Sequence, residues 1–439
     1  AVAGRPVLAA HPVPTKQTEQ TGDDKVQPST GKFRLTERSP DDRAWRPTNT
    51  IVRGRSWTTF EKVGLAGNRE RDRATELLAE NIEVGRSDRA LVLNCGSGLV
   101  GAVAATLATD GQVVLADASL VAVEAARRTL AELGVGNAEI FHSAGASHLP
   151  RPRVFDLAVV RMPKGRRPTT QLIWDAFRLL RPGGRFYLAG ANDEGIQSAF
   201  ERARQLFGSC RLVEYRGGCR VGRAIKEESP ADELTGDFAS PLLDHSTFHA
   251  FQCDVRGRSY QVRSRPGVFS WEGLDAGSRA LIEAMEIGVR DRVLDLGCGT
   301  GIVGVVAADL AKAGEVYLVD AQVDAVASTE QTIQANGRPN CVARASDSIS
   351  AVGQARFDVV VTNPPFHLAR GTDYDVASQF IVDAARVLRP SGRLYLVGNR
   401  FLTYDDTLRQ TFASVRTVLA DPRYRVFVAY PRATSTTLA

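Results

Sequence analysis

Short apolar runs alternate with longer stretches of helical periodicity over most of this chain. In its first half, four runs of buried-strand type are predicted, at 90–93, 112–116, 155–160 and 185–189. Between them, apolar residues recur at helical spacing, which predicts helices over 99–107, 121–133 and 171–180. Strands that alternate with helices in this way form a parallel sheet with helices on both faces. The pattern therefore predicts an α/β fold.

The same series returns about 200 residues later, and this internal repeat organises the whole chain. A glycine turn at 94–98 is matched by another at 297–301. Asp117 follows the last glycine of the first turn by 19 residues, and Asp320 follows the last glycine of the second turn by the same 19. The chain thus contains two copies of one domain, and we expect two tandem Rossmann-like domains.

Composition divides the chain into four parts. Residues 1–50 are rich in Pro, Thr, Gln, Asp and Lys with little periodic apolar content, which predicts a disordered or loosely attached extension. We assign 51–225 to the first copy and 247–439 to the second. The stretch 226–246 carries Glu, Asp, Ser, Pro and Gly and is predicted to be a linker. Alternating residues at the start of the second copy predict a hairpin that turns at Arg256-Gly257.

Length and composition are those of a globular protein with two full cores. The chain has 439 residues, of which 43% are apolar. No apolar run approaches the length of a membrane span, and the N-terminal stretch lacks the apolar core of a secretory signal, so we expect a cytoplasmic protein. The six cysteines include no Cys-x-x-Cys pair, so the sequence indicates neither a zinc site nor a disulfide framework.

One strand of the second copy, 357–362, ends at Asn363-Pro364-Pro365-Phe366-His367. Two prolines donate no N–H and cannot continue a sheet, so a stiff turn follows at the edge where open α/β sheets bind ligands. Asn363 and Pro364 offer carbonyl acceptors, and Phe366 offers a flat apolar face. This set suits a planar heterocycle with an exocyclic amino group. A lone Asn-Pro-Pro is usually only a turn, and the neighbouring motifs favour the functional interpretation.

The second glycine turn has the features of a nucleotide-type pocket. Gly297, Gly299 and Gly301 follow Asp295, and their lack of side chains lets a ligand approach the backbone. Asp320, at the end of the next strand, is well placed to accept hydrogen bonds from ribose hydroxyls.

A glycine turn followed by an acid also fits a dinucleotide enzyme, so the cofactor must be chosen on other features. A further acid, Asp347, precedes the Asn-Pro-Pro strand and could face an adenine amino group. No Gly-Lys-Ser/Thr phosphate loop occurs. These features favour S-adenosylmethionine over NAD.

The first copy differs from the second where chemistry is expected. Val92 stands where the second copy has Asp295, and Asn94 stands where it has Gly297. We therefore expect the first copy to have kept the fold and lost the reaction, binding no cofactor.

Basic residues occupy the edge of the first copy that corresponds to the Asn-Pro-Pro turn. The net charge of +5 is compatible with a nucleic-acid partner without identifying one. The local group suits contact with RNA phosphates, although a solvated face is the alternative. Its members are Arg161, Lys164, Arg166 and Arg167.

The second half resembles the catalytic domain of the bacterial tandem-domain ribosomal RNA guanine-N2 methyltransferases, which are class I S-adenosylmethionine-dependent enzymes. The resemblance spans about 247–430, and its most specific part is Asn-Pro-Pro-Phe-His. The stretches that carry it are 266–270, 274–278, 295–301, 346–347, 363–367 and 398–404. The duplicated first half is also similar to that family's architecture. Thr403 departs from the family, which often has proline there, and the long N-terminal extension is unfamiliar.

The resemblance implies a role for each matched residue. Asn363, Pro364 and Phe366 would handle the target base, and His367 would either contact RNA or make a structural hydrogen bond. The cofactor pocket would be lined by Asp295, Gly297, Asp320, Asp347 and Asn363. Ribosomal RNA or a ribosomal subunit would be the partner, and we expect a monomer.

Two further classes of function stay open at this point. N6-adenine methylation of nucleic acid and methylation of a protein glutamine amide both present an amino nitrogen that the same turn can hold. A protein of another class, a catalytically silent RNA-binding or ribosome-assembly factor, would use the fold without the reaction. The complete second glycine turn and the intact Asn-Pro-Pro-Phe argue against the silent factor.

Overall fold

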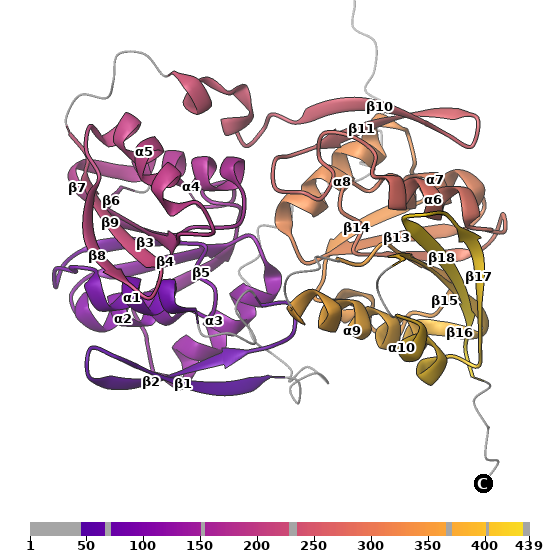
Figure 1. Cartoon of the computed structure of the whole chain (residues 1–439), viewed down its shortest axis with the longest axis horizontal. Helices are drawn as coiled ribbons and strands as arrows, with labels where there is room; N and C mark the ends of the chain where they lie inside the picture. The colour runs from indigo at the N-terminus through magenta and orange to yellow at the C-terminus, as the bar shows by residue number, and fades with distance from the viewer. Residues whose placement is uncertain are drawn as a thin grey trace, which may run out of the picture. The chain divides into compact units, whose positions relative to one another are not determined.

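The computed structural model describes residues 45–65, 72–150, 154–227, 235–365, 371–400 and 404–432. These residues belong to one compact unit and form two copies of the same α/β domain (Figure 1). None of the helices in these ranges is long and apolar enough to cross a membrane.

The first copy consists of a hairpin followed by a seven-stranded sheet. The hairpin strands are β1 (Arg46–Val52) and β2 (Arg55–Glu61). The sheet strands are β3 (Arg89–Leu93), β4 (Gln112–Asp117), β5 (Ala138–His142), β6 (Phe155–Arg161), β7 (Leu180–Ala191), β8 (Arg211–Arg216) and β9 (Cys219–Ile225). The helices are α1 (Arg73–Asn81), α2 (Leu99–Leu107), α3 (Leu120–Glu132), α4 (Arg166–Leu179) and α5 (Ile196–Phe207). The strand order is β5-β4-β3-β6-β7-β9-β8, with β9 antiparallel to both of its neighbours.

The second copy repeats this plan after two short 3-10 turns, η2 (Gly236–Ala239) and η3 (Pro241–Leu243). Its hairpin is β10 (His249–Val255) and β11 (Arg258–Ser264). Its sheet strands are β12 (Arg292–Leu296), β13 (Glu315–Asp320), β14 (Cys341–Ala345), β15 (Phe357–Thr362), β16 (Leu388–Asn399), β17 (Ser414–Ala420) and β18 (Tyr424–Tyr430). Its helices are α6 (Ala276–Ala284), α7 (Ile302–Leu310), α8 (Val323–Ala335), α9 (Gly371–Val387) and α10 (Tyr404–Thr411). The order β14-β13-β12-β15-β16-β18-β17 is that of the first sheet.

Apolar cores lie on both faces of each sheet. In the second copy, α6 and α7 bury residues such as Leu281 and Val305 against one face. On the opposite face, α9 and α10 bury Ile381 and Leu408 (Figure 1). Strands covered on both sides read as continuous apolar runs, which is why the sequence pattern located them. The predicted fold, two tandem Rossmann-like domains, is confirmed.

The predicted hairpin of the second copy is confirmed, and an equivalent hairpin that the sequence did not predict opens the first copy. Arg256 and Gly257 have φ of 49° and 71°, the left-handed pair of a tight hairpin turn, and Arg53 and Gly54 have φ of 53° and 70°. Residues 46–50 pair within β1 and so do not belong to the predicted extension. This strand is mostly exposed, so it lacks the apolar signal that marks the core strands.

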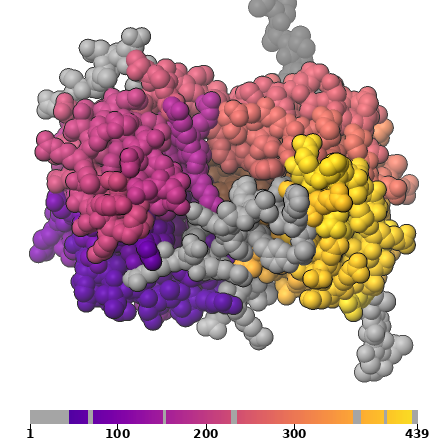
Figure 2. Space-filling view, in the orientation of Figure 1, coloured from indigo at the N-terminus to yellow at the C-terminus, as the bar shows by residue number. Residues whose placement is uncertain are grey.

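The two copies meet through equivalent residues. The N–H of Leu120 donates to the carbonyl of Ala321 over 2.8 Å, and the N–H of Val323 donates to the carbonyl of Ala118 over 2.9 Å. Equivalent positions of the two copies lie 203 residues apart, so Leu120 corresponds to Val323 and Ala118 to Ala321. The second hydrogen bond is therefore the same contact with the two copies exchanged. Such a self-complementary contact is what a two-fold axis produces in a dimer. Figure 2 shows the surfaces of the first copy, indigo to magenta, and of the second, orange to yellow.

The packing of α7 on β13 gives a test of the fold. We expect Gly304→Ala to lower the free energy of unfolding by about 1–3 kcal/mol, since the added Cβ would lie 2.6 Å from Cγ of Leu318. Gly136→Ala is the control, because its Cβ would meet nothing within 4 Å. Urea unfolding measures both variants. Equal losses of stability would contradict the close packing at Gly304.

Candidate functional site

The glycine turn of the second copy joins β12 to α7 in a conformation that only glycine adopts easily. Gly297, Gly299 and Gly301 have φ of 78°, 55° and 80°. A Cβ on Gly297 would lie 2.9 Å from the Phe380 ring, and one on Gly301 would lie 2.9 Å from the Thr329 side chain. A Cβ on Gly299 would meet nothing within 4 Å, so this part of the turn borders open space. Two glycines are therefore required by packing, and the third leaves room for a ligand.

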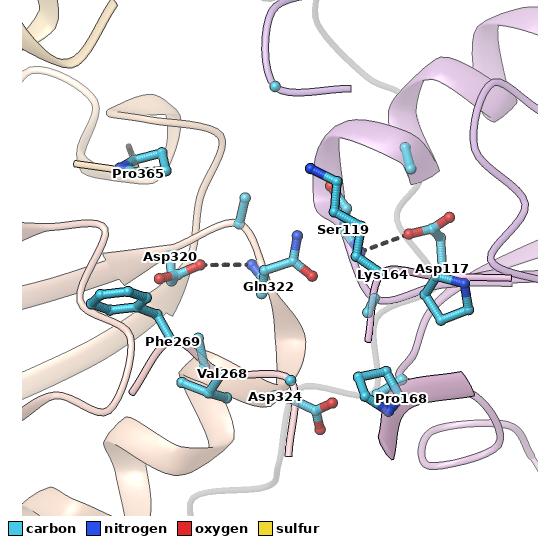
Figure 3. Close-up of a pocket in the computed structure, with 18 of the residues that line it drawn as sticks. Asp117, Ser119, Lys164, Pro168, Val268, Phe269, Asp320, Gln322, Asp324 and Pro365 are labelled. Carbon is cyan, nitrogen blue, oxygen red and sulfur yellow. Dashed lines mark hydrogen bonds between the residues drawn. The ribbon is translucent and has the colours of Figure 1, made fainter. Parts of the chain in front are cut away.

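Asp320 ties this turn to the end of β13. One carboxylate oxygen accepts from the N–H of Gly299 over 3.0 Å, and the other accepts from the N–H of Gln322 over 2.9 Å (Figure 3). Burial raises the pKa of the Asp320 carboxyl, while these backbone donors oppose the rise. The carboxylate thus lies beside the turn, at the wall of the cavity.

Asp295 supports the turn from the buried side. Its side chain is 2% exposed, and Oδ2 accepts from the N–H of Gly304 in α7 over 2.8 Å. Burial raises the pKa of Asp295 to about 7, although the bond from Gly304 lowers it. Val92 fills the equivalent position of the first copy and is equally buried.

Asn363 lies directly after β15, and its amide is oriented by two partners. Nδ2 donates to Oδ2 of Asp275 over 3.0 Å and to Oγ of Ser278 over 2.9 Å. Only the NH₂ end of an amide can donate to a carboxylate, so the contacts fix which way the amide points. Oδ1 of Asn363 is buried and has no hydrogen-bond partner among the described residues. Buried acceptors are nearly always paired, so this one is available to a ligand.

Asp275 and Ser278 had no assigned role in the sequence-based prediction. Asp275 is the N-cap of α6, and its Oδ2 accepts from the N–H of Ser278 over 2.8 Å. The spacing Asp-x-x-Ser before an apolar run is a sequence signal for a helix start. The Asp275 side chain also binds the amide of Asn363. A local sequence pattern cannot predict this contact, because the two residues are 88 positions apart.

The remaining residues of the Asn-Pro-Pro turn divide into two groups. Pro364 is buried, Pro365 is exposed, and both line the cavity. Phe366 and His367 lie outside the described residues, so their predicted roles stay predictions.

Asp347 follows β14 and also lines the cavity. Its Oδ2 accepts from Nζ of Lys62 over 2.6 Å. Lys62 belongs to the first copy, so the two copies meet at the predicted cofactor pocket.

The cavity has a volume of about 1270 Å³ and is lined by residues of both copies. Figure 3 shows Lys164 of the first copy and Asp320 and Pro365 of the second among them. Pockets for one small molecule usually have about 300–1,000 Å³, so this cavity has room for a cofactor and a second ligand. Phe269, which the sequence-based prediction also left without a role, is 50% exposed and lines the same cavity.

In the first copy, ion pairs take the place of the Asn363 amide, while the glycine turn beside them also lines the cavity. Arg161, in the position of Asn363, places Nε 3.2 Å from Oδ2 of Asp72 and NH1 2.9 Å from Oε2 of Glu194. Its side chain is 15% exposed. Asn94 donates from Nδ2 to the carbonyl of Arg161 over 2.8 Å, which joins the glycine turn to the same cluster. The guanidinium therefore has carboxylate partners within its own copy, and its predicted contact with RNA stays a prediction.

The other predicted RNA-binding residues lie at the surface. Lys164 is exposed and lines the cavity. Arg166 is 71% exposed and pairs with Asp237 over 2.7 Å. The Arg167 guanidinium lies 5.0 Å from the centre of the Trp271 ring.

Together these features define the class of the protein. A Rossmann-like sheet with a glycine turn, an acid after the next strand and an oriented Asn-Pro-Pro turn is the arrangement of a class I S-adenosylmethionine-dependent methyltransferase. The family described as "Methyltransferase small domain" matches residues 56–223 and 259–428, and the chain belongs to this family.

Individual relatives agree with this assignment. "Ribosomal RNA small subunit methyltransferase C" of Stutzerimonas stutzeri (strain A1501) is 33% identical over 282 residues, 64% of this chain and 80% of the relative. The protein of the same name from Hahella chejuensis (strain KCTC 2396) is 31% identical over 284 residues, 64% of this chain and 79% of the relative.

A solved structure extends the likeness over both copies. The T. thermophilus 16S rRNA N2 guanosine methyltransferase RsmC, in complex with AdoMet and guanosine, is 30% identical, with a TM-score of 0.73. The match covers 88% of this chain and 98% of that one. The predictions of a methyltransferase enzyme and of S-adenosylmethionine as its cofactor are confirmed.

The raised pKa of Asp295 predicts a pH-dependent stability. Because the folded state binds this proton more tightly than the unfolded chain, the stability that Asp295 contributes is complete below about pH 4 and lost as pH rises to about 7. We expect the wild type to lose stability relative to Asp295→Asn over this window, by up to about 1.4 kcal/mol per pH unit.

Urea unfolding of the wild type and Asp295→Asn at several pH values measures this difference, and groups common to both cancel. Asparagine keeps an oxygen that can accept from Gly304, so the variant tests the charge rather than the hydrogen bond. A difference that does not change with pH would show that the Asp295 pKa is unshifted.

Proposed function

We propose that this protein transfers the methyl group of S-adenosylmethionine to the exocyclic N2 of a guanosine in small-subunit ribosomal RNA. The observation that carries the proposal is the buried Oδ1 of Asn363, which has no partner among the described residues and lies at the wall of a cavity that also borders an intact glycine turn. Relatives named for small-subunit ribosomal RNA methylation, and a structural neighbour described with AdoMet and guanosine, support the choice of substrate.

The residues around the glycine turn fit an adenosine cofactor. The open face of Gly299 gives access to the backbone, and Asp320 beside it can accept hydrogen bonds from ribose hydroxyls. Asp347, at the end of the neighbouring strand, can accept from the adenine amino group. The sulfonium of the bound cofactor supplies an already activated methyl group, so the protein has to orient the base and exclude water.

The Asn-Pro-Pro turn orients the nucleophile. A guanine amine is a poor nucleophile because its lone pair spreads into the ring. Oδ1 of Asn363 and the carbonyl of Pro364 would each accept one amine hydrogen, which favours a pyramidal nitrogen whose lone pair faces the methyl group. Asp275 and Ser278 hold the amide of Asn363 in this orientation. No strong base is needed, since the product proton can leave to water after transfer.

The RNA must present its base unstacked. Extruding a base costs a few kcal/mol, which favours loops or partly assembled subunits as substrates. Phe366 would stack on the base, and His367 would contact RNA or support the turn. Lys164, Arg166 and Arg167 would contact phosphates from the first copy. Monomeric state and cytoplasmic location belong to this proposal as well.

Adenine N6 and glutamine amides offer the same pair of amine hydrogens, so the turn alone does not separate them from guanine. Neither the silent RNA-binding factor nor these substrates account for relatives and a structural neighbour that are named as ribosomal RNA methyltransferases. Guanosine N2 is therefore the substrate to test first.

The first test is the ribosomal RNA of cells that lack the gene. We expect one N2-methylguanosine to be missing from small-subunit RNA in nucleoside mass mapping, and to return with the wild-type gene but not with Asn363→Ala. Loss of one positioning hydrogen bond should lower the rate about a hundredfold or more. Binding of S-adenosylhomocysteine, measured by calorimetry, should persist in the variant.

Asn192→Ala is the matched control, because Asn192 is an exposed asparagine of the first copy. It should restore methylation as the wild type does. Full activity of Asn363→Ala would remove the assigned role of the amide, and an unchanged guanosine profile in the deletion strain would contradict guanosine N2 as the target.

The changed residues of the first copy, Val92, Asn94 and Arg161, predict one cofactor per chain. Arg161 stands at the position of Asn363 and is paired with Asp72 and Glu194, so this position has no amide oxygen to offer a ligand. We expect calorimetric titration with S-adenosylmethionine to give a stoichiometry near one. Two equivalents bound per chain would show that the first copy has kept a cofactor site.

A further inference from the structure

We infer that Lys62 of the first copy is a positioning residue for cofactor recognition in the second copy, because it holds the Asp347 carboxylate at the adenine end of the pocket. The inference rests on the proposed function, in which Asp347 accepts a hydrogen bond from the adenine amino group. The first copy, which we expect to have lost the reaction, would then help the second copy to recognise its cofactor.

The contact itself is close and sheltered. Nζ of Lys62 lies 2.6 Å from Oδ2 of Asp347, and the two side chains are 7% and 23% exposed. Lys62 follows β2, and its Nζ also lies 5.6 Å from the centre of the Trp45 ring. A charge-assisted bond of this length between groups with little access to water is geometrically specific. It joins residues 285 positions apart in the sequence.

The internal symmetry of the chain shows that this pair is selective. Arg265 is the equivalent of Lys62, and Ala144 is the equivalent of Asp347. The neighbouring serines confirm the second match, since Ser346 donates to the carbonyl of Ser348 and Ser143 donates to that of Gly145. The first copy therefore has no acid at the position of Asp347, and Arg265 approaches Asp175 of the first copy through His245.

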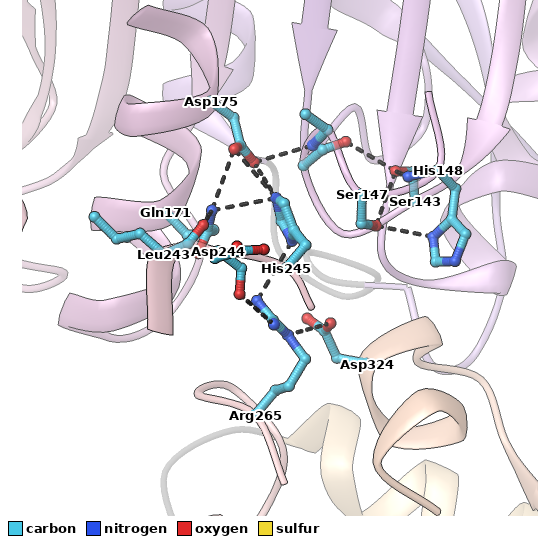
Figure 4. A network of polar contacts seen from close by, with 12 residues as sticks. Ser143, Ser147, His148, Gln171, Asp175, Leu243, Asp244, His245, Arg265 and Asp324 are labelled. Atoms are coloured by element: carbon cyan, nitrogen blue, oxygen red, sulfur yellow. Dashed lines mark hydrogen bonds and ion pairs between the residues drawn. The ribbon is translucent and has the colours of Figure 1, made fainter. Parts of the chain in front are cut away.

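Arg265 makes different contacts. Its guanidinium places Nε 3.2 Å from Oδ1 of Asp324 and donates from NH1 to the carbonyls of Asp244 and Thr247 (Figure 4). These are residues of its own copy and of the segment that precedes it. Of the two symmetric positions, Lys62 pairs with a carboxylate of the other copy, and Arg265 has no such pair among the described residues.

The pair affects recognition through the orientation of the carboxylate. The bond to the ammonium group restricts the rotamers of Asp347. A carboxylate has about four acceptor positions, so a bond to Lys62 is compatible with accepting an adenine N–H as well. The backbone of the same loop is also held, because the N–H of Asp347 donates to Oγ of Ser350 over 3.0 Å. Removing Lys62 should therefore weaken discrimination of the adenine amino group.

The test compares two ligands that differ at that group, S-adenosylhomocysteine and S-inosylhomocysteine, by calorimetry on the full chain. A hydrogen bond to a charged acceptor predicts about a tenfold preference of the wild type for the adenosyl ligand. In Lys62→Met we expect the preference to fall to about threefold or less, with weaker adenosyl binding. Asp347→Ala should abolish the preference, and adding Lys62→Met to it should change nothing further.

Two controls separate positioning from folding. Lys62→Arg keeps the charge and should keep the preference, whereas Arg86→Met breaks an exposed ion pair with Asp110 elsewhere in the first copy and should behave as the wild type. If Lys62→Met does not fold, Lys62→Gln retains a donor without the charge and provides the same comparison. A wild-type preference in a folded, uncharged variant would overturn the inference. Failure of the wild type to bind S-adenosylhomocysteine at all would instead overturn the proposed function.

Discussion

The site depends on the side-chain carbonyl oxygen of Asn363, which is buried and has no partner in the part of the chain that the structure describes. Leaving a buried acceptor unpaired costs about 1–3 kcal/mol, so the surrounding structure has to hold Asn363 in place. The nitrogen end of the same amide is bound by Asp275 and Ser278, and this anchoring offsets the cost at the oxygen. A rotated amide would place its oxygen against the Asp275 carboxylate, which has no hydrogen to donate, and would present N–H groups to the cavity. The helix cap of α6 thus determines which chemical group the cavity presents.

The two copies have the same fold but carry a neutral side chain in one and a charged side chain in the other at the same position. Asp72 and Asp275 are equivalent helix caps, and each binds the residue at the C-terminal end of the central strand, β6 or β15. In the second copy that residue is a neutral amide, and the cavity beside it stays open. In the first copy it is Arg161, whose charge is neutralised by Asp72 and Glu194. Removing both acids would leave a largely buried cation uncompensated, so this arrangement is stabilised by its own charges.

The sequence predicted those features that depend on neighbouring residues. The central strands, the 99–107 helix and the turn at Arg256-Gly257 have local apolar or turn signals, and the structure places them accordingly. β1 and β8 carry mostly exposed side chains, so periodicity did not separate them from loops.

Within the site, the glycine turn and the acids after the strands follow from the βα repeat. The partners of Asn363 are 85 and 88 positions away, and Lys62 is 285 positions from Asp347. Such pairs depend on how the sheets and the two copies pack together. A short stretch of sequence holds no information about this packing.

The self-complementary contact between Leu120–Ala321 and Val323–Ala118 has a consequence for how the protein behaves on dilution. In two separate chains, a contact of this kind would dissociate as concentration falls. Covalent connection within one chain makes this contact intramolecular, so its effective concentration does not depend on the amount of protein. The catalytic half therefore keeps its supporting half when the protein is diluted. In addition, a substitution in one half does not appear in the other, as it would in a dimer of identical chains.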